Sequence, residues 1–525
     1  MQNIRIPLTE KDLNSLSHGR VSIVPGRPDV HIVDREVQIP IQLMEVLNPH
    51  SGVYITALSF TNCIFLHPVD IGLYTSAGRV IFKKCQFHAD VSISSTANVT
   101  IVAGCYFAQN LTIQEVSQIP EVGNFTIDGE LLVHGNGKKL ILSNINSTIQ
   151  AQKLVVKPGT SELQIIHCFF KRIYVFPHPT RRNTISVHGS YTNRMAIIAG
   201  LEDCHVVLNE SELQRISISG SFDSKISMKI TYCKKIRELI LPMSRICKAE
   251  ISYCEFNKLQ IWEASNKSDV LTIENSTVNQ LLFWRFINEG LISLRSLTIP
   301  EGGTLGIHSS NLGRTEFITC DFSQATLEFE NSRLTEVFVA ETDFPVRVVL
   351  RKEVNHVQAQ LAFGQLRTAF DKQGDTVRAL EYQSREIEAH YHNIRSFWRK
   401  RAPFLHFTKL NLGLNRLSND FGRDWGRGIV FAIVIGLTCF AGLVWTTQEY
   451  SIHGHWQFDH HLIASFVRFM NPLRFFDLET LFTQNGKQPY VTLTWGSYVM
   501  DFLGRISLAY AYYQTIQAFR RYGRK

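Results

Sequence analysis

The chain has 525 residues, which is enough for two or three domains and a large hydrophobic core. Its formal charge of +8 permits an anionic partner without requiring one. The ten cysteines include no CxxC pair, so the sequence gives no support to a zinc ribbon or a thioredoxin-like site. The first residues, MQNIRIPLTEKDLNSL, contain no apolar run, and we therefore expect no cleaved secretory signal.

Most of the cysteines recur inside one short pattern in the N-terminal part of the chain. The sequence reads SFTNCIF from Ser59, IFKKCQF from Ile81 and IVAGCYF from Ile101. Apolar alternation around each copy predicts a short strand, and a repeat of about 20–22 residues is typical of a stacked β-solenoid. We expect the cysteines to be small, reduced side chains buried in the solenoid core. The repeat weakens between Gln118 and Pro158, which leaves two β lobes or a sandwich-like part as alternatives.

Basic and aromatic residues crowd one stretch of this β region. Cations interleaved with aromatic rings suit single-stranded nucleic acid, because the cations pair with phosphates and the rings stack on bases. Ordinary solubilising charge is the alternative interpretation. The residues that we predict to bind a ligand or DNA are Lys171, Arg172, Tyr174, Arg181, Arg182 and Arg194.

A helical region follows, over His356–Lys400, with a break at Gly374 and Asp375. Gly374 suits the C-cap of a first helix and Asp375 the N-cap of a second, which predicts an αα-hairpin. Two interpretations of such a hairpin are open: a neck that transmits force or makes subunit contacts, and a simple packed spacer. The basic, aromatic and glycine-containing segment Arg401–Gly428 is expected to lie at membrane headgroups.

The stretch Gly428–Thr446, GIVFAIVIGLTCFAGLVWT, has no charged residue. At a rise of about 1.5 Å per residue it is long enough to cross the ~30 Å hydrocarbon core of a bilayer. Trp425 and Trp445 stand near its two ends like interfacial anchors. The sequence therefore predicts a transmembrane helix, with a buried core helix of a soluble domain as the alternative.

A second span is predicted over Val491–Phe519, which is helical in period but carries Asp501 and Arg505. These two residues are four apart, so they share a helix face and can pair. Charges at membrane depth usually face a bundle interior or a water-filled path. We predict Asp501, Arg505 and Ser497 to line or brace a pore; a structural ion pair between packed helices is the alternative.

The segment His461–Phe482, between the two spans, is amphipathic and too short for a full span on either side of Pro472. It is interpreted as re-entrant or interfacial. Helix, re-entrant segment and helix make the layout of a minimal channel subunit, and a water-filled pore would then require a ring of subunits. No filter run of the Thr-Val-Gly-Tyr-Gly kind is present, so potassium selectivity has no support.

Four parts are expected: a β-solenoid sensor over 1–350, a helical neck over 351–400, an interfacial linker over 401–427 and a channel-like membrane domain over 428–525. Basic residues flank the two spans, while the loop between them has few. The positive-inside rule therefore predicts a multi-pass inner-membrane protein with both ends in the cytoplasm. The sequence contains no P-loop, HExxH or GxSxG motif, and we expect neither catalysis nor a cofactor.

Three segments resemble the C-terminal half of bacterial membrane proteins with cytosolic β-rich repeats: Gln365–Ala389, Leu414–Gly428 and Arg505–Gly523. In architecture the chain resembles the membrane effector of Hailong anti-phage systems. That resemblance implies an ion channel with a cytosolic crown domain, which binds a single-stranded deoxyadenylate oligomer made by a partner nucleotidyltransferase. It also implies that bound DNA keeps the channel shut, and that loss of the signal during infection opens it and kills or arrests the cell.

The sequence thus leads to the hypothesis of a homotetrameric or otherwise homo-oligomeric channel effector, gated by a β-rich domain that binds a single-stranded oligodeoxynucleotide. A different class of protein is the alternative: a non-conducting, membrane-tethered scaffold whose solenoid binds other proteins.

Overall fold

The structure is a computed structural model of the whole chain. The residues that it describes are 6–8, 29–33, 35–37, 41–42, 57–71, 79–93, 98–102, 104–116, 121–135, 139–146, 153–157, 162–176, 182–199, 203–220, 225–350, 353–397, 405–447, 460–471, 478–482 and 491–522. They divide into two compact units, Met1–Arg347 and Val348–Lys525. Each unit is described by itself.

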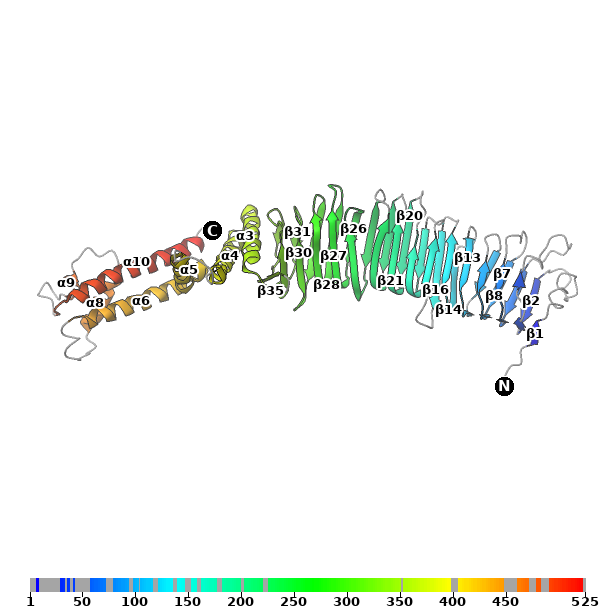
Figure 1. Cartoon of the computed structure of the whole chain (residues 1–525), viewed down its shortest axis with the longest axis horizontal. Helices are drawn as coiled ribbons and strands as arrows, with labels where there is room; N and C mark the ends of the chain where they lie inside the picture. Colours follow the sequence, from blue (N-terminus) through cyan, green and yellow to red (C-terminus); the bar gives the residue numbers. More distant parts are fainter. Residues whose placement is uncertain are drawn as a thin grey trace. The chain divides into compact units, whose positions relative to one another are not determined.

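The first unit is a β-solenoid with coils of about 22 residues, as the sequence predicts (Figure 1). Its described strands are β1 (Ile6–Leu8), β2 (Asp29–Val33), β3 (Arg35–Val37), β4 (Ile41–Gln42), β5 (Ala57–Thr61), β6 (Ile64–Phe65), β7 (Val69–Ile71), β8 (Arg79–Lys83), β9 (Gln86–Phe87), β10 (Val91–Ile93), β11 (Asn98–Val102), β12 (Cys105–Phe107), β13 (Leu111–Val116), β14 (Glu121–Ile127), β15 (Leu131–Gly135), β16 (Lys139–Asn146), β17 (Lys153–Lys157), β18 (Glu162–Ile166), β19 (Phe169–Val175), β20 (Asn183–His188), β21 (Tyr191–Ala199), β22 (Cys204–Asn209), β23 (Glu212–Gly220), β24 (Ile226–Thr231), β25 (Ile236–Pro242), β26 (Ile246–Ser252), β27 (Glu255–Ala264), β28 (Val270–Ile287), β29 (Leu291–Thr298), β30 (Thr304–His308), β31 (Glu316–Ile318), β32 (Thr326–Glu330) and β33 (Phe338–Ala340).

Strands of successive coils pair in parallel and in register, so equivalent residues stack into columns. One such column has side chains that are all 0% exposed. Its members are Leu111, Leu131, Leu154, Ile173, Met195, Ile216, Leu239, Leu259, Leu281, Leu305 and Leu327. Because this column runs without interruption past Gln118 and Pro158, the β region is one solenoid, and the alternatives of two lobes or a sandwich-like part are wrong.

The repeated cysteines follow a corner of the coil. The residue before each of several cysteines has a left-handed backbone, for example His167 with φ 49° and Tyr253 with φ 55°. The thiol that follows then approaches main-chain carbonyls: Cys168 Sγ lies 3.3 Å from Ile166 O and 3.4 Å from Leu142 O. Burial raises the pKa of Cys168 to about 12, which keeps the thiol neutral.

Serine replaces cysteine at the same corner of other coils. Ser190 Oγ donates to His188 O at 3.0 Å, and it accepts the main-chain N–H of Cys168 at 3.0 Å. All ten cysteines are free, and eight of them are buried, so the expectation of reduced, buried cysteines is confirmed for those eight. The pattern therefore reflects a small polar side chain that satisfies main-chain groups inside the corner.

The second unit begins with an antiparallel pair of strands, and the rest of its described part is helical. Its elements are β34 (Arg347–Leu350), β35 (Glu353–Val354), α3 (His356–Gln373), α4 (Thr376–Phe397), α5 (Leu405–Asn419), the 3-10 turn η2 (Asp420–Gly422), α6 (Trp425–Trp445), α8 (His460–Phe469), α9 (Leu478–Leu481) and α10 (Trp495–Tyr522). The predicted αα-hairpin is confirmed as α3 and α4. Gly374 ends α3 with φ 79°, and Asp375 Oδ1 accepts the N–H of Arg378 at 3.0 Å.

Helix α6 covers the predicted first span. Of the helices in the described part of the chain, it alone is long and apolar enough to cross a membrane, judged by length and composition. The predicted second span overlaps α10, whose polar and charged residues make it less apolar than a candidate span, so length and composition support one of the two predicted spans among the described helices. Helix α9 lies within the predicted re-entrant segment, α8 begins one residue before it, and Pro472 lies outside the described residues.

Candidate functional site

The solenoid brings two of the predicted binding residues directly together. Arg172 in β19 and Arg194 in β21 are register partners, and both are exposed. Tyr174 lies two residues further along β19 and is half-buried, and Lys171 is exposed beside Arg172. Arg182 is exposed before β20, which belongs to a different ladder of strands, so it is not in this column. Arg181 lies outside the described residues.

Two further cations extend the column that holds Arg172 and Arg194. Lys153 is the register partner of Arg172, and Arg215 is the register partner of Arg194. We refer to Lys153, Arg172, Arg194 and Arg215 as the cation column. The sequence analysis looked for charges crowded in one stretch, and it therefore did not identify Lys153 or Arg215. A search for cations spaced by the coil period of about 22 residues would have identified both.

The two ends of the cation column are neutralised, but its middle is not. Lys153 Nζ lies 3.5 Å from Glu130 Oε2, and Arg215 Nε lies 2.9 Å from Glu238 Oε2. Hydrogen bonding from Lys258 is the main cause that lowers the pKa of Glu238. Among the residues that the structure describes, no carboxylate lies within 4 Å of Arg172 or Arg194. Like charges on neighbouring strands, about 4.8 Å apart, repel each other, so a bound polyanion would reduce the repulsion between Arg172 and Arg194.

One exposed aromatic ring, Phe169, and two half-buried ones, Tyr174 and Tyr191, accompany the cation column. Phe169 and Tyr191 are register partners three residues before the two central arginines, and their rings stack at a centroid distance of 6.2 Å. Lys153 Nζ lies 5.6 Å from the centre of the Tyr174 ring. Rings and cations along one edge of a stack are the groups that bind bases and phosphates of a single strand.

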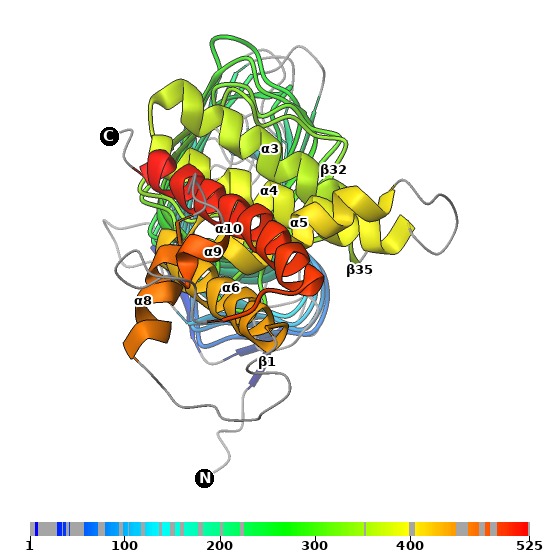
Figure 2. The same ribbon diagram turned by 90° about the vertical axis from the view of Figure 1, so that its left-hand side faces the viewer.

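In the second unit, α6 and α10 lie side by side (Figure 2). Their contact is built from small residues. A Cβ added at Gly428 of α6 would lie 3.2 Å from the Thr515 Cα of α10, and one added at Gly442 of α6 would meet Met500 Cε of α10. Close approach through glycine is the way in which helices pack in lipid, where apolar burial gives little driving force.

The predicted pore residues lie on or beside this contact. Asp501 Oδ2 accepts a hydrogen bond from Arg505 Nε at 2.9 Å, so the pair forms as its spacing predicts. Asp501 is 6% exposed and Ser497 is fully buried. Ser497 Oγ donates to Thr446 O at 3.2 Å, and this bond joins the start of α10 to the end of α6. Within one chain the Ser497 bond links α10 to the end of α6, whereas the Asp501–Arg505 bond lies within α10, and the role of these residues in a pore stays a prediction.

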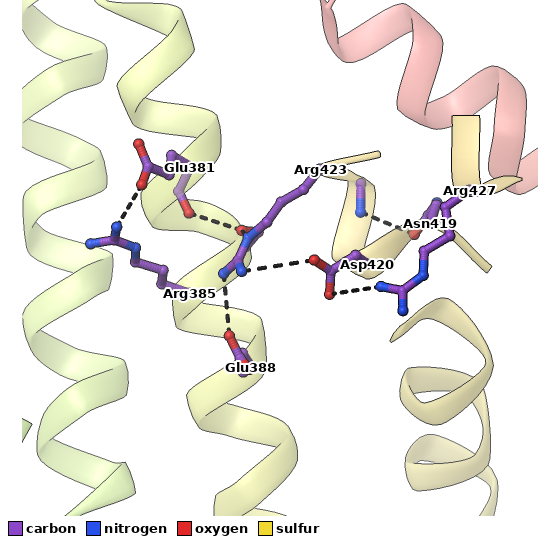
Figure 3. Close-up of polar contacts among 9 residues, drawn as sticks. Glu381, Arg385, Glu388, Asn419, Asp420, Arg423 and Arg427 are labelled. Carbon is purple, nitrogen blue, oxygen red and sulfur yellow. Dashed lines mark hydrogen bonds and ion pairs between the residues drawn. The ribbon is translucent and has the colours of Figure 1, made fainter. Parts of the chain in front are cut away.

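A third cluster surrounds η2, between α5 and α6 (Figure 3). Arg423 donates through Nε to Ser384 Oγ and through Nη2 to Glu388 Oε2 at 3.2 Å, and both partners belong to α4. Asp420 Oδ2 lies 3.9 Å from Arg423 Nη1. Asn419 Nδ2 donates to both O and Oε1 of Gln514 in α10, at 3.1 and 3.0 Å. We call Asn419–Arg423 the elbow.

Comparison with known proteins adds no relative: no protein-family model, no curated protein and no solved structure matches the chain.

Proposed function

We propose that the chain is a subunit of an oligomeric membrane channel, an effector of anti-phage defence that its β-solenoid gates by binding a single-stranded oligodeoxynucleotide. The observation that carries this proposal is the pairing of α6 with α10. An apolar helix of membrane length packs through glycines against a helix that carries the Asp501–Arg505 pair, of which Asp501 is buried. A helix with charged residues, such as α10, is tolerated in a membrane where its charges face protein or water.

An assembly of several copies would cover the apolar surface that a single chain leaves open. On α6, Val430 is 60% exposed, and on α10, Phe502 is 63% exposed. Such faces fit lipid or a neighbouring subunit, and a ring of subunits, a homotetramer or another homo-oligomer, is needed to enclose water. In this proposal the chain lies in the bacterial inner membrane with both ends in the cytoplasm.

The cation column supports an anionic polymer as the ligand of the solenoid. A single-stranded DNA oligomer made by a partner nucleotidyltransferase would place phosphates on Arg172 and Arg194 and bases on the Phe169–Tyr191 stack. Loss of the oligomer would open the channel, depolarise the membrane, and kill or arrest the infected cell.

The binding half of the proposal is tested with a fluorescent oligodeoxyadenylate and the full chain in detergent. We expect the double variant Arg172→Gln/Arg194→Gln to weaken binding at least about tenfold and to flatten its salt dependence. Arg182→Gln is the matched control, because it removes an exposed cation from another ladder. Equal losses in the control, or no binding by the unmodified chain, would contradict the proposed site.

A protein-binding scaffold is the second candidate function, and a specific surface favours it. Tyr232 and Tyr253 stack at 5.0 Å on adjacent coils, and each is more than half exposed. Exposed tyrosines are common anchors of protein interfaces. Asp501→Lys separates the two functions: it should change or abolish conductance in a channel, and should leave a scaffold's binding unchanged.

A further inference from the structure

The elbow has a backbone conformation that its surroundings must hold in place. Asp420, Phe421 and Gly422 are three consecutive residues with positive φ, of 49°, 57° and 88°. Phe421 is fully buried, and its ring centre lies 6.3 Å from that of Tyr391 in α4. A left-handed conformation is unfavourable for a phenylalanine and persists only where neighbouring contacts fix it.

Those contacts come from two helices that are far apart in the sequence. Arg423 reaches α4 through two different nitrogens, so its planar guanidinium sets both the distance and the direction of the contact. Asn419 uses its amide nitrogen on Gln514 of α10 and its amide oxygen on the N–H of Gly422 at 3.0 Å. The five residues from Asn419 to Arg423, which carry these bonds and the turn, thus link α4 to α10.

We infer that the elbow is the coupling element of the helical unit, and that Arg423 is the latch that ties α10 to the position of α4. This inference rests on the proposed function, in which a signal from the solenoid passes through the α3–α4 hairpin to the membrane helices. Movement of α4 away from Arg423 releases the strained turn, and the turn then no longer orients Asn419 toward Gln514. Two arrangements of one packed segment are what a switch requires.

The test is amide hydrogen exchange of the full chain in detergent, with a change on α4 and a readout on α10. Glu388→Gln removes a charged partner of Arg423, and we expect the amides of α10 near Ala518 to exchange about five- to tenfold faster. That segment is informative because Gln514 O accepts from Asn419. Arg423→Gln should give the same or a larger effect.

Arg385→Gln is the matched control. It also removes a charge from α4, but its partner, Glu381, lies on the same helix at 2.6 Å (Figure 3). Unchanged α10 exchange in both Glu388→Gln and Arg423→Gln, or an equal response in Arg385→Gln, would overturn the latch.

Currents in planar bilayers separate the latch from the proposed function. If the chain conducts, Glu388→Gln should shift the ligand concentration that closes it by about the same five- to tenfold factor. If no variant conducts while α10 exchange still responds to Glu388→Gln, the channel proposal fails and the latch stands. If currents respond to ligand equally in all variants and α10 exchange does not change, the latch fails and the channel stands.

Discussion

The two units of this chain solve the packing problem in opposite ways. The solenoid fills its interior with large apolar side chains and turns its buried corner cysteines and serines toward main-chain carbonyls. The helical unit brings its main pair of helices together through glycines and leaves large apolar residues outside. On α6 these are Trp425, Ile429, Val430, Ile433, Val434, Leu437 and Trp445. The second pattern leaves a large exposed apolar face, which is typical of surfaces that contact a membrane or partner proteins.

The largest effect should come from a cavity in the solenoid core. Leu281→Ala should cost about 3 kcal/mol, because the fully buried leucine stacks between Leu259 and Leu305 in register. Hydrogen exchange of β27 and β30 should report the loss while that of α6 stays unchanged. Leu291→Ala, at a position that is 53% exposed, is the control and should have little effect. An equal response of the helical unit would mean that the two units do not unfold separately.

A side chain added at the glycine contact between α6 and α10 should cause the next largest loss of stability. Gly428→Val should cost about 1–3 kcal/mol, because a Cβ there meets Thr515 Oγ1 at 2.6 Å and main chain at 3.2 Å. The melting temperature in detergent measures it. Val430→Leu changes volume on the exposed face of the same helix and should be nearly neutral. Similar losses in both variants would contradict packing of α6 and α10 through glycines.

At a corner of the solenoid, the free energy of unfolding should depend more on the hydrogen bonds of the side chain than on its volume. Ser310 Oγ accepts the N–H of Phe286 at 3.0 Å and donates to His308 O at 2.7 Å. Ser310→Ala should therefore cost about 1–2 kcal/mol. Ser310→Cys should cost less, since a thiol occupies the equivalent corner of other coils. Urea unfolding compares the two variants, and equal losses would show that the hydrogen bonds contribute nothing.

Acidification should give the smallest effect, and in the helical unit it should act through His356. Burial, and then His392 nearby, lower the pKa of His356 below its ordinary 6.5. The unfolded chain therefore binds more protons near this pH, so the α3–α4 hairpin loses stability as the pH falls below about 6.5. Burial, and then Lys157 nearby, likewise lower the pKa of His134, so the solenoid also loses stability as the pH falls below about 6.5. The lowered pKa of Glu238 gives the solenoid further stability, which is lost only as the pH falls below the ordinary 4.5 of a glutamate.

Thermal scans between pH 7 and 4 check this, with His356→Gln as the variant that should abolish the early loss in the hairpin and leave that of the solenoid unchanged. An early loss in the hairpin that persists in His356→Gln would contradict this role of His356.

Much of the fold follows from local patterns in the sequence. The coil period, the alternation of strands, the Gly374–Asp375 break and the apolar run of α6 each depend on residues close together in the chain. The cation column needed the register between coils, which joins Lys153 to Arg172 and Arg194 to Arg215. Residues of the elbow cluster lie farther apart still: Arg423 contacts Ser384, 39 positions earlier, and Asn419 contacts Gln514, 95 positions later. Such contacts depend on tertiary packing, and no pattern in one sequence encodes them.

The most direct measurement is the conductance of the purified chain in planar bilayers before and after nuclease treatment, with the same preparation assayed for co-purifying oligonucleotide. A channel held shut by single-stranded DNA predicts a silent membrane first and a current once the bound oligomer is digested. Arg172→Gln/Arg194→Gln should conduct without nuclease. A membrane that stays silent throughout, with no nucleic acid in the preparation, would contradict the channel and leave the tethered scaffold as the better explanation.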